Sequence, residues 1–359
     1  MKALVAMSGG VDSSVAAYLL QKKGYEVTGL SFELWDQRDR KNLSVCCSVE
    51  TIDIARKIAG KLGIEHHTVD VRDTFYRYVI EEFCSSYSTG LTPNPCILCN
   101  KFIKFRFLLK KAEEFKADIV ATGHYARVEK PHVKGEHIRN KRILLKKGID
   151  LRKDQSYVLY VMTQEELSKV EFPLGGLRKE ETKRIARELG LVSALRPESQ
   201  EICFVGERSY VDFIKGFAPD LVQPGPVINR EGKVIGEHQG IAFYTIGQRK
   251  RLGIQSLSPH YVMTIDRHNN AIIVGSREDI MRKVFKVKDL NWGSISSLSG
   301  PMRVTAKIRS TMEEALAVII PDINQMVTVE FDEPQWAPAS GQSAVFYNRD
   351  TVVGGGIII

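Results

Sequence analysis

Short apolar runs alternate with helical patterns over the N-terminal part of the chain. Runs apolar enough for buried strands lie at 2–7, 26–32, 65–71 and 118–122. Apolar residues recur at helical spacing between these runs, at 13–23, 48–62, 72–86 and 100–115. Strands that alternate with helices in this way predict an α/β fold with a parallel sheet and right-handed crossovers.

The pattern changes after about residue 165 and again after about residue 223. Short helices are predicted at 164–169 and 179–189, and Gly190 ends the second. From 223 onward, turn residues separate closely spaced β-type runs, which predicts a small antiparallel barrel or a sandwich. These runs lie at 227–229, 233–237, 261–266, 271–275, 302–309, 314–320, 325–331, 342–347 and 351–358. We therefore expect domain boundaries that give 1–165, 166–222 and 223–359.

Composition makes this an ordinary globular chain. It has 359 residues, of which 43% are hydrophobic and 26% charged, and no window approaches the roughly 18 apolar residues of a membrane span. The chain enters a strand at once, without a signal sequence, so we expect a cytoplasmic protein. Its 6 cysteines are too few for a disulfide scaffold, and in a reducing compartment they indicate metal binding or catalysis.

The net charge of +8 is unevenly distributed. The segment from Arg127 to Lys153 holds ten Lys and Arg residues against three Asp and Glu residues. A solvated hairpin is one interpretation, and an edge that binds a polyanion is the other. Further cations at Lys101, Lys104 and the run 249–251 favour the polyanion, because clustered Lys and Arg are typical of phosphate-backbone binding.

The most specific chemical signal is the stretch 3–14, which reads ALVAMSGGVDSS. A strand that ends in two glycines, an acid and hydroxyls, and then enters a helix, builds a phosphate cradle at the helix N-terminus. An ordinary Gly-Gly turn would need neither the paired serines nor Asp12. The loop is not a Walker loop, because no GxxxxGK[ST] occurs.

Two cysteine segments stand out. In TPNPCILCNKFIKF, residues 92–105, Cys99 is expected just before a lysine-rich helix, a position that lowers a thiol pKa from about 8.5 towards neutrality. Cys203 lies between Ile202 and Phe204, and a lone cysteine in such surroundings is usually a buried small hydrophobe. Cys84 is expected in the core as well, whereas Cys46 and Cys47 are expected to pack or to cap the helix at 48.

Three histidines are candidates for different roles. His66 and His67 lie in a β-type run, so alternation places one of them inside as a structural residue. His124 follows Gly123 at the end of a predicted strand on the nucleotide side, and this position favours a functional role.

The loop SGGVDSS resembles the PP-loop of ATP pyrophosphatases, which split ATP into AMP and pyrophosphate. The whole chain resembles the tRNA-specific 2-thiouridylase family in the order and spacing of its motifs. These motifs are GLSFELWD, TPNPxxxCNKxIKF, ATGHYAR, KDQSYxLY, SQxICFVGER, GEHQG, YTIGQRKxLGI and the terminal GQSAVFYNxxxVxGGGII. The resemblance implies a PP-loop domain, a small central domain and a C-terminal β-barrel. It also implies 2-thiolation of the wobble uridine of tRNA.

The resemblance further implies a role for particular residues. ATP would be held by Ala6, Met7, Ser8, Gly9, Gly10, Val11, Asp12 and Ser13, with Phe32 and Gly123 near the nucleoside. Asp12 would help to bind Mg²⁺. Contacts to tRNA or its target base would come from Asn94, Pro95, Cys96, His124, Lys153, Asp154, Gln155, Arg309, Ser310 and Gln342.

By the same resemblance, Cys203 would carry a persulfide and Cys99 would end in a disulfide with it, after a cysteine desulfurase or a sulfur-relay protein has supplied the sulfur. One departure opens an alternative, since many family members have aspartate where this chain has Cys96. Cys96, Cys99 and Cys203 together would suit a 4Fe-4S cluster that delivers sulfide.

Two other functions compete with tRNA thiolation. A PP-loop ligase acting on a small molecule would need neither the thiols nor the basic segment. An RNA-binding protein with a structural zinc site would need four ligands, and the sequence offers no second CxxC or HxxxH to complete the set.

Overall fold

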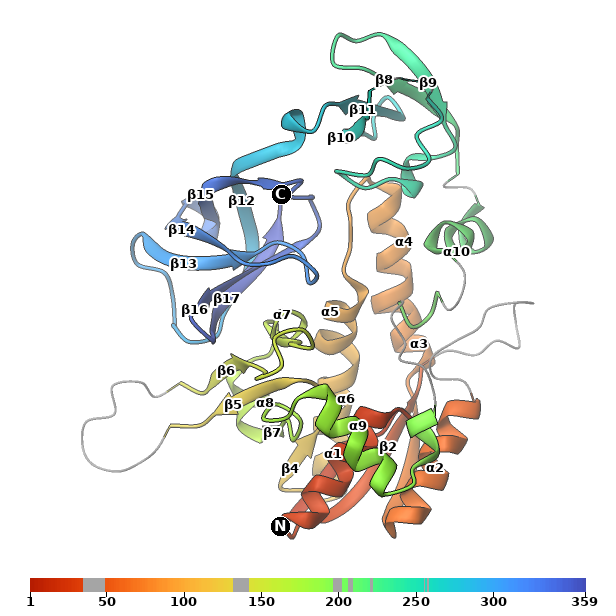
Figure 1. Cartoon of the computed structure of the whole chain (residues 1–359), viewed down its shortest axis with the longest axis vertical. Coiled ribbons are helices and arrows are strands. Elements are labelled where there is room, and N and C mark those ends of the chain that lie inside the picture. The colour runs from red at the N-terminus through yellow and green to blue at the C-terminus, as the bar shows by residue number, and fades with distance from the viewer. Residues whose placement is uncertain are drawn as a thin grey trace.

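The computed structural model describes residues 1–34, 49–131, 142–195, 202–205, 209–219, 222–254, 256 and 258–359. Cys46 and Cys47 lie outside these residues, as does the middle of the basic segment between Arg127 and Lys153. In the described part of the chain no helix is long and apolar enough to cross a membrane. Figure 1 shows an N-terminal α/β part, a smaller sheet reached by the helical stretch that ends in α4 (Glu81–Ser88), and a barrel at the C-terminus.

The N-terminal sheet has five strands in the order β3-β2-β1-β4-β7, and all its pairs are parallel. The strands are β1 (Lys2–Ala6), β2 (Glu26–Glu33), β3 (Glu65–Asp70), β4 (Ile119–Ala121) and β7 (Val170–Glu171). Leu4 packs into one core cluster and its neighbours Ala3 and Val5 into another, because alternate side chains point to opposite faces. Both faces are therefore buried, and the predicted parallel α/β fold is confirmed.

Helices cover the two faces of this sheet. On the face of Ala3 and Val5 lie α1 (Val11–Lys22), α2 (Val49–Leu62) and α9 (Lys179–Glu188). On the face of Leu4 lie two long helical stretches, each with a π-helical turn inside. The first comprises α3 (Arg72–Phe75), η1 (Tyr76–Ile80) and α4 (Glu81–Ser88), and the second comprises α5 (Pro95–Cys99), η2 (Asn100–Lys104) and α6 (Phe105–Glu114).

Smaller elements connect this sheet to the rest of the chain. A hairpin of β5 (Ala126–Glu129) and β6 (Leu144–Lys147) follows β4. The helical elements after it are α7 (Ser156–Leu159), α8 (Gln164–Lys169), η3 (Val192–Leu195) and α10 (Tyr210–Phe217).

The β-rich remainder forms two separate sheets. The first has the order β10-β11-β8-β9 and contains β8 (Gly225–Ile228), β9 (Val234–His238), β10 (Tyr261–Asp266) and β11 (Ala271–Gly275). The second runs from β12 (Met281–Trp292) to β17 (Thr351–Ile358) and closes into an antiparallel barrel through the β12–β17 pair. Its other strands are β13 (Met302–Lys307), β14 (Ala315–Pro321), β15 (Val327–Trp336) and β16 (Ser343–Asn348). The C-terminal barrel implied by the resemblance is confirmed.

The strands expected within 223–359 form two sheets. In the described residues, β8 to β11 pair only with one another. The parallel β11–β8 pair joins the hairpins β8–β9 and β10–β11 into one sheet. Strand β12 was not predicted, since charged and polar residues interrupt its apolar alternation. The sequence also gave no sign that the hairpin β5–β6 extends the barrel sheet, which it joins where Lys146 pairs with Thr351.

Candidate active site

The loop between β1 and α1 forms a tight turn at the carboxyl end of the sheet. Gly9 has a φ of 74°, and a Cβ there would lie 2.5 Å from the carbonyl oxygen of Thr51 in α2. The hydroxyls of Ser13 and Ser14 donate to the Gly10 carbonyl at 3.2 and 2.7 Å. The N–H of Ser8 donates to Ser13 Oγ at 3.2 Å, so hydroxyls and glycines together fix the shape of the loop. The predicted strand, turn and helix are all present, with α1 beginning at Val11.

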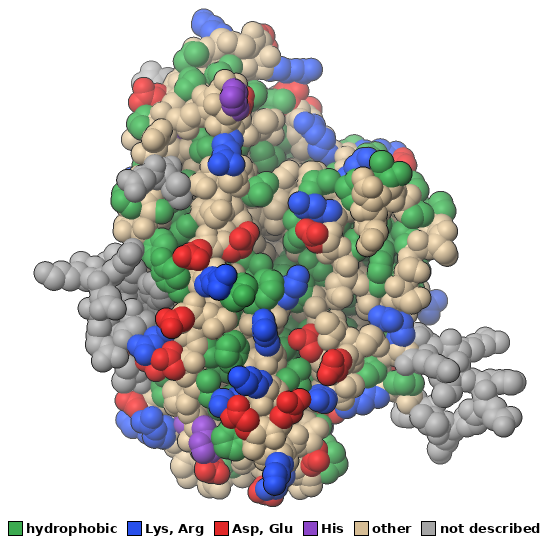
Figure 2. Space-filling model, turned by 180° about the vertical axis from the view of Figure 1, so that it is seen from behind, with side chains coloured by type: hydrophobic (Ala, Val, Ile, Leu, Met, Phe, Trp, Pro, Cys, Tyr) green, Lys and Arg blue, Asp and Glu red, His purple; other side chains and the backbone are tan. Residues whose placement is uncertain are grey.

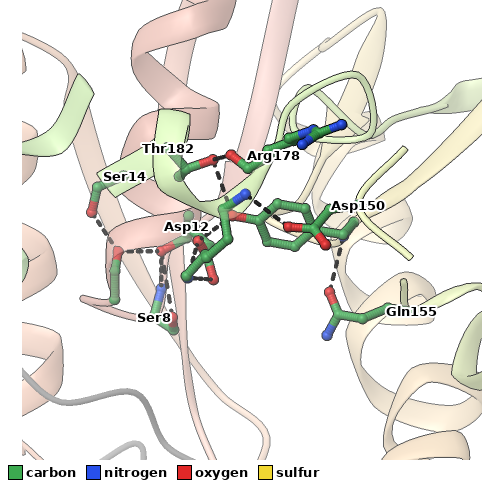
Figure 3. A network of polar contacts seen from close by, with 11 residues as sticks. Ser8, Asp12, Ser14, Asp150, Gln155, Arg178 and Thr182 are labelled. Carbon is green, nitrogen blue, oxygen red and sulfur yellow. Dashed lines mark hydrogen bonds and ion pairs between the residues drawn. The ribbon is translucent and has the colours of Figure 1, made fainter. Parts of the chain in front are cut away.

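Asp12 lies in the first turn of α1 and is paired with a lysine. Lys179 Nζ, from the first residue of α9, lies 2.6 and 2.8 Å from the two carboxylate oxygens of Asp12. Tyr125 donates its hydroxyl to Asp12 Oδ1 at 2.9 Å, and the hydroxyl oxygen lies 3.0 Å from Thr182 Oγ1. Figure 3 shows Asp12 and Thr182 in this network. The Asp12 side chain is 34% exposed whereas that of Lys179 is 6% exposed, so the carboxylate still faces the space in front of the loop.

Lys179 was missed by the sequence reasoning. A lysine at the start of a strongly charged helix is normally a solvent-exposed residue, and only the packing of α9 against α1 reveals that it is buried. Because an ammonium group is costly to bury without a partner, Asp12 is what keeps it in place. The loop lacks the lysine of a Walker motif, but Lys179, far along the chain, places an ammonium group next to it.

Gly123 lies directly against the start of α1. A Cβ at Gly123 would lie 2.7 Å from the backbone of Asp12 and Ser13, so only glycine allows this approach. Phe32 lies near the end of β2, with its side chain in the core. The structure thus places Asp12, Ser13, Gly123 and Phe32 at the carboxyl ends of β1, β2 and β4, the edge where open α/β sheets bind ligands.

A Mg²⁺ ion next to Asp12 is compatible with these residues. One partly exposed carboxylate, completed by phosphate oxygens and water, is a common way for proteins to hold this cation. Lys179 now contacts both carboxylate oxygens, so the cation would have to share Asp12 with the ammonium or displace it.

The cysteine segment 92–105 forms a helix that starts earlier than expected. Asn94 caps it by accepting a hydrogen bond from the Ile97 N–H at 3.3 Å, and Pro95 occupies its first position. Cys99 therefore lies inside the helix, and the expectation that it precedes one is wrong. The positive end of the helix lies next to Cys96, which is exposed, whereas Cys99 is buried.

Cys203 reaches the same core through its neighbour Phe204. The Phe204 ring lies 5.9, 5.1 and 5.1 Å from the rings of Phe75, Phe83 and Phe213. Cys203 is half-buried against the core cluster that contains Cys99 and Phe32. Cys99 and Cys203, about a hundred residues apart in the sequence, thus share one core cluster.

Cys84 lies in the interior, as predicted. Burial raises the pKa of its thiol to about 12, so it stays protonated at neutral pH. Among the described residues, no three His, Cys, Asp or Glu side chains are grouped so as to hold a metal ion. The donor set Cys96, Cys99 and Cys203 is therefore not gathered for a 4Fe-4S cluster in this conformation.

Several of the residues expected to contact tRNA form bonds within the protein. Asp154 accepts hydrogen bonds from the backbone of Gly148 and Ser156 at 3.0 and 3.1 Å. Arg309 donates to the carbonyls of Ile246 and Ala337 at 3.0 and 2.9 Å, and burial lowers the pKa of its guanidinium. Both side chains therefore hold the structure together, whatever else they contact.

His124 and Gln342 also have internal partners. His124 is buried, its Nδ1 lies 2.7 Å from Thr122 Oγ1, and desolvation holds its pKa well below the usual value. A neutral imidazole at this position cannot form an ion pair with a phosphate group. Gln342 donates to the Thr92 carbonyl at 3.2 Å, which ties the barrel to the loop just before Asn94. Lys153, Gln155 and the exposed Ser310 lie at the surface or half-buried.

The described cations of the basic hairpin are engaged in the structure. Lys147 is buried, forms an ion pair with Glu314 and lies 4.4 Å from the centre of the Tyr347 ring. Lys146 lies 3.0 Å from Glu129 and 3.3 Å from Asp350, and Arg142 donates to the carbonyls of Gly293 and Trp292. On the face shown in Figure 2, Lys and Arg side chains alternate with Asp and Glu rather than forming one patch. Among the described residues of the segment, Arg142, Lys146 and Lys147 are therefore engaged within the protein.

Family descriptions match three consecutive parts of the chain. A tRNA methyl transferase HUP domain matches residues 1–207, and a tRNA methyl transferase PRC-barrel domain matches 211–276. An aminomethyltransferase beta-barrel domain matches 282–358. The three ranges coincide with the parallel sheet and its helices, the four-stranded sheet and the closed barrel.

Curated relatives match almost end to end. The tRNA-specific 2-thiouridylase MnmA 2 of Thermoanaerobacter sp. (strain X514) is 48% identical over 357 residues, covering 99% of this chain and 96% of that protein. The tRNA-specific 2-thiouridylase MnmA of Acetivibrio thermocellus is 46% identical and covers 99% of each chain. Among solved structures, a 4-thiouridine synthetase in complex with RNA and bound ATP has a TM-score of 0.37 and 19% identity, covering 61% of this chain and 50% of that one.

Proposed function

The chain belongs to the tRNA-specific 2-thiouridylase family, and we propose that it replaces oxygen 2 of the wobble uridine of tRNA by sulfur at the expense of ATP. The observation that carries this proposal is the pairing of two kinds of site on one sheet. A phosphate-type loop with its Asp12–Lys179 ion pair lies at the strand ends, and the core cluster on the Leu4 face of the same sheet contains Cys99 and Phe32, with Cys203 packed against it.

The first step is activation of the uridine. Oxygen 2 attacks the α-phosphorus of ATP, pyrophosphate leaves, and the base becomes an adenylate whose leaving group is AMP. The loop residues Ala6 to Ser13 bind the phosphates with backbone N–H groups, and Lys179 supplies positive charge at the same place. A Mg²⁺ ion held by Asp12 would neutralise the phosphate oxygens as pyrophosphate departs.

The second step transfers sulfur. A donor protein, either a cysteine desulfurase or a sulfur-relay protein, loads Cys203 as a persulfide. The terminal sulfur attacks carbon 2 and AMP leaves, which joins the base to Cys203 through two sulfur atoms. The Cys99 thiolate then attacks the Cys203 sulfur, releasing 2-thiouridine and forming a Cys99–Cys203 disulfide, and a dithiol reductant restores both thiols.

The site favours thiolation over the competing reactions. Methyl transfer, the activity in the names of two of the matched domains, needs a methyl donor but neither a pyrophosphate-releasing loop nor paired thiols. A ligase for a small molecule would need no thiols. For tRNA binding, the exposed Cys96 and the half-buried Asn94 and Lys153 are the strongest of the expected contacts, because they are accessible.

The nucleotide products test this proposal. With ATP, a sulfur donor and unmodified tRNA, AMP and pyrophosphate should appear in equal amounts and in step with thiolated tRNA. Fully 2-thiolated tRNA is the matched control, and with it neither product should accumulate, because oxygen 2 is absent. Formation of ADP and phosphate in place of AMP would contradict the proposal.

A further inference from the structure

The segment Asp150–Gln155 lies between the hairpin β5–β6 and α7, and hydrogen bonds lead from both of its ends towards Asp12. It includes Lys153, Asp154 and Gln155, which are expected to contact tRNA. Asp150, at its start, is buried and has no role in the function proposed above. Figure 3 shows Asp150 and Gln155 on one side of the network that ends at Asp12.

The first connection runs through Asp150. Its Oδ2 accepts the backbone N–H of Lys179 at 3.0 Å, and its Oδ1 accepts that of Arg152 at 3.2 Å. The side chain of the same Lys179 holds both carboxylate oxygens of Asp12. Lys179 alone thus connects Asp150 to Asp12.

The second connection runs through Gln155. Its side-chain Oε1 accepts the backbone N–H of Tyr125 at 2.9 Å, and its own N–H donates to the Tyr125 carbonyl at 2.9 Å. The hydroxyl of Tyr125 donates to Asp12 Oδ1. Both connections therefore converge on one carboxylate, from opposite ends of the same six-residue segment.

The surrounding packing leaves little freedom for independent movement. Ile149 donates its N–H to the Gly175 carbonyl at 3.0 Å, and a Cβ at Gly175 would lie 1.8 Å from the carbonyl oxygen of Ala126. Closely packed interiors transmit displacements instead of absorbing them. A shift of Asp150 or Gln155 would therefore move the backbone of Lys179 or of Tyr125. The side chains of these two residues contact Asp12.

We propose that Asp150 and Tyr125 are positioning residues that couple tRNA binding at the segment 150–155 to the phosphate end of the ATP site. This inference rests on the proposed function, because it takes tRNA and ATP as the two ligands. Coupling of this kind is reciprocal, so tRNA changes the affinity for nucleotide by the same factor by which nucleotide changes the affinity for tRNA.

The test measures this factor with a nucleotide that cannot react. The affinity of the full chain for Mg²⁺ and α,β-methylene ATP is measured by calorimetry with and without unmodified tRNA. In the unaltered protein, tRNA should change the dissociation constant by about fivefold or more. In Asp150→Ala and in Tyr125→Phe the change should fall below about twofold, while the affinity for tRNA in the absence of nucleotide stays as in the unaltered protein.

Gln164→Ala is the matched control. Gln164 binds the backbone of Ile143, just before β6, and the carbonyl of Gly293, and these bonds do not involve the network of Asp12. This variant should keep the full coupling. Should Asp150→Ala fail to fold, Tyr125→Phe decides alone, since it removes one hydroxyl.

Three outcomes would overturn the inference. They are a factor near one in the unaltered protein, full coupling in Asp150→Ala and Tyr125→Phe, and loss of coupling in Gln164→Ala. Assays of 2-thiouridine in the same preparations separate this failure from that of the proposed function. If thiolated tRNA forms without coupling, only the positioning role is wrong, whereas absence of thiolation with every donor removes the premise as well.

Discussion

Replacing Cys99 or Cys203 with serine will lower the rate of 2-thiouridine formation by about a thousandfold or more. A serine hydroxyl at position 203 cannot carry a persulfide, and one at position 99 cannot release the sulfur by forming a disulfide. Each change replaces one sulfur atom with oxygen and keeps the number of side-chain atoms. The affinity for tRNA and the thermal stability should therefore change little. The rate is measured from thiolated tRNA in single-turnover experiments with a sulfur-loaded donor.

Cys84→Ala is the control for this pair. Cys84 is as buried as Cys99, but its thiol is held protonated by desolvation, so its loss should leave the rate within about twofold. Equal losses in all three variants would mean that core packing, and not sulfur chemistry, explains the effect.

The variant Cys96→Asp distinguishes sulfur transfer from a persulfide from sulfur transfer by a cluster. It keeps activity if Cys99 and Cys203 suffice, and it loses iron and activity together under anaerobic conditions if three thiolates hold a 4Fe-4S cluster.

Asp12→Asn and Lys179→Met will each lower the rate of pyrophosphate release by about a hundredfold to a thousandfold. The first removes the carboxylate from the start of α1. The second removes a buried ammonium group that lies 2.6 Å from that carboxylate. In the proposed function this positive charge stabilises the phosphates of ATP. Pyrophosphate release is followed with saturating ATP and tRNA, and circular dichroism checks the fold.

Lys61→Met is the matched control for Lys179→Met. Lys61 is an exposed lysine of α2 whose Nζ donates to the Gly190 carbonyl at 2.6 Å, just beyond the end of α9. Its loss removes one charge and one hydrogen bond close to the same helix but away from Asp12. If both lysine variants lose the same activity, or if Lys179→Met retains full activity, the assigned role of Lys179 is wrong.

The sequence predicted those parts of the site that depend on local structure. The strand 2–7, the glycine turn and the helix after it follow from apolar patterning and from the backbone freedom of Gly9. Helix α9 and the paired runs around 227–237 and 261–275 were also found, because turn residues mark their ends. The core position of Cys84 followed from helical spacing alone.

The missing parts depend on contacts between distant residues. Nothing near Lys179 in sequence shows that α9 packs on α1 and turns a lysine inward to Asp12. The start of the helix at Pro95 was overlooked because two prolines suggested a loop, although proline is favoured at the first helical position. The partners of Lys146 and Lys147 could not be predicted, because Asp350 and Glu314 lie far along the chain in the barrel.

The central claim, that this chain thiolates the wobble uridine of tRNA, is tested most directly by nucleoside analysis. Unmodified tRNA is incubated with the protein, ATP and a sulfur-loaded cysteine desulfurase, then digested to nucleosides and examined by mass spectrometry. We expect 2-thiouridine at the wobble position, formed only when ATP is present. Appearance of a methylated uridine in its place, or recovery of unmodified uridine despite consumption of ATP, would contradict the account.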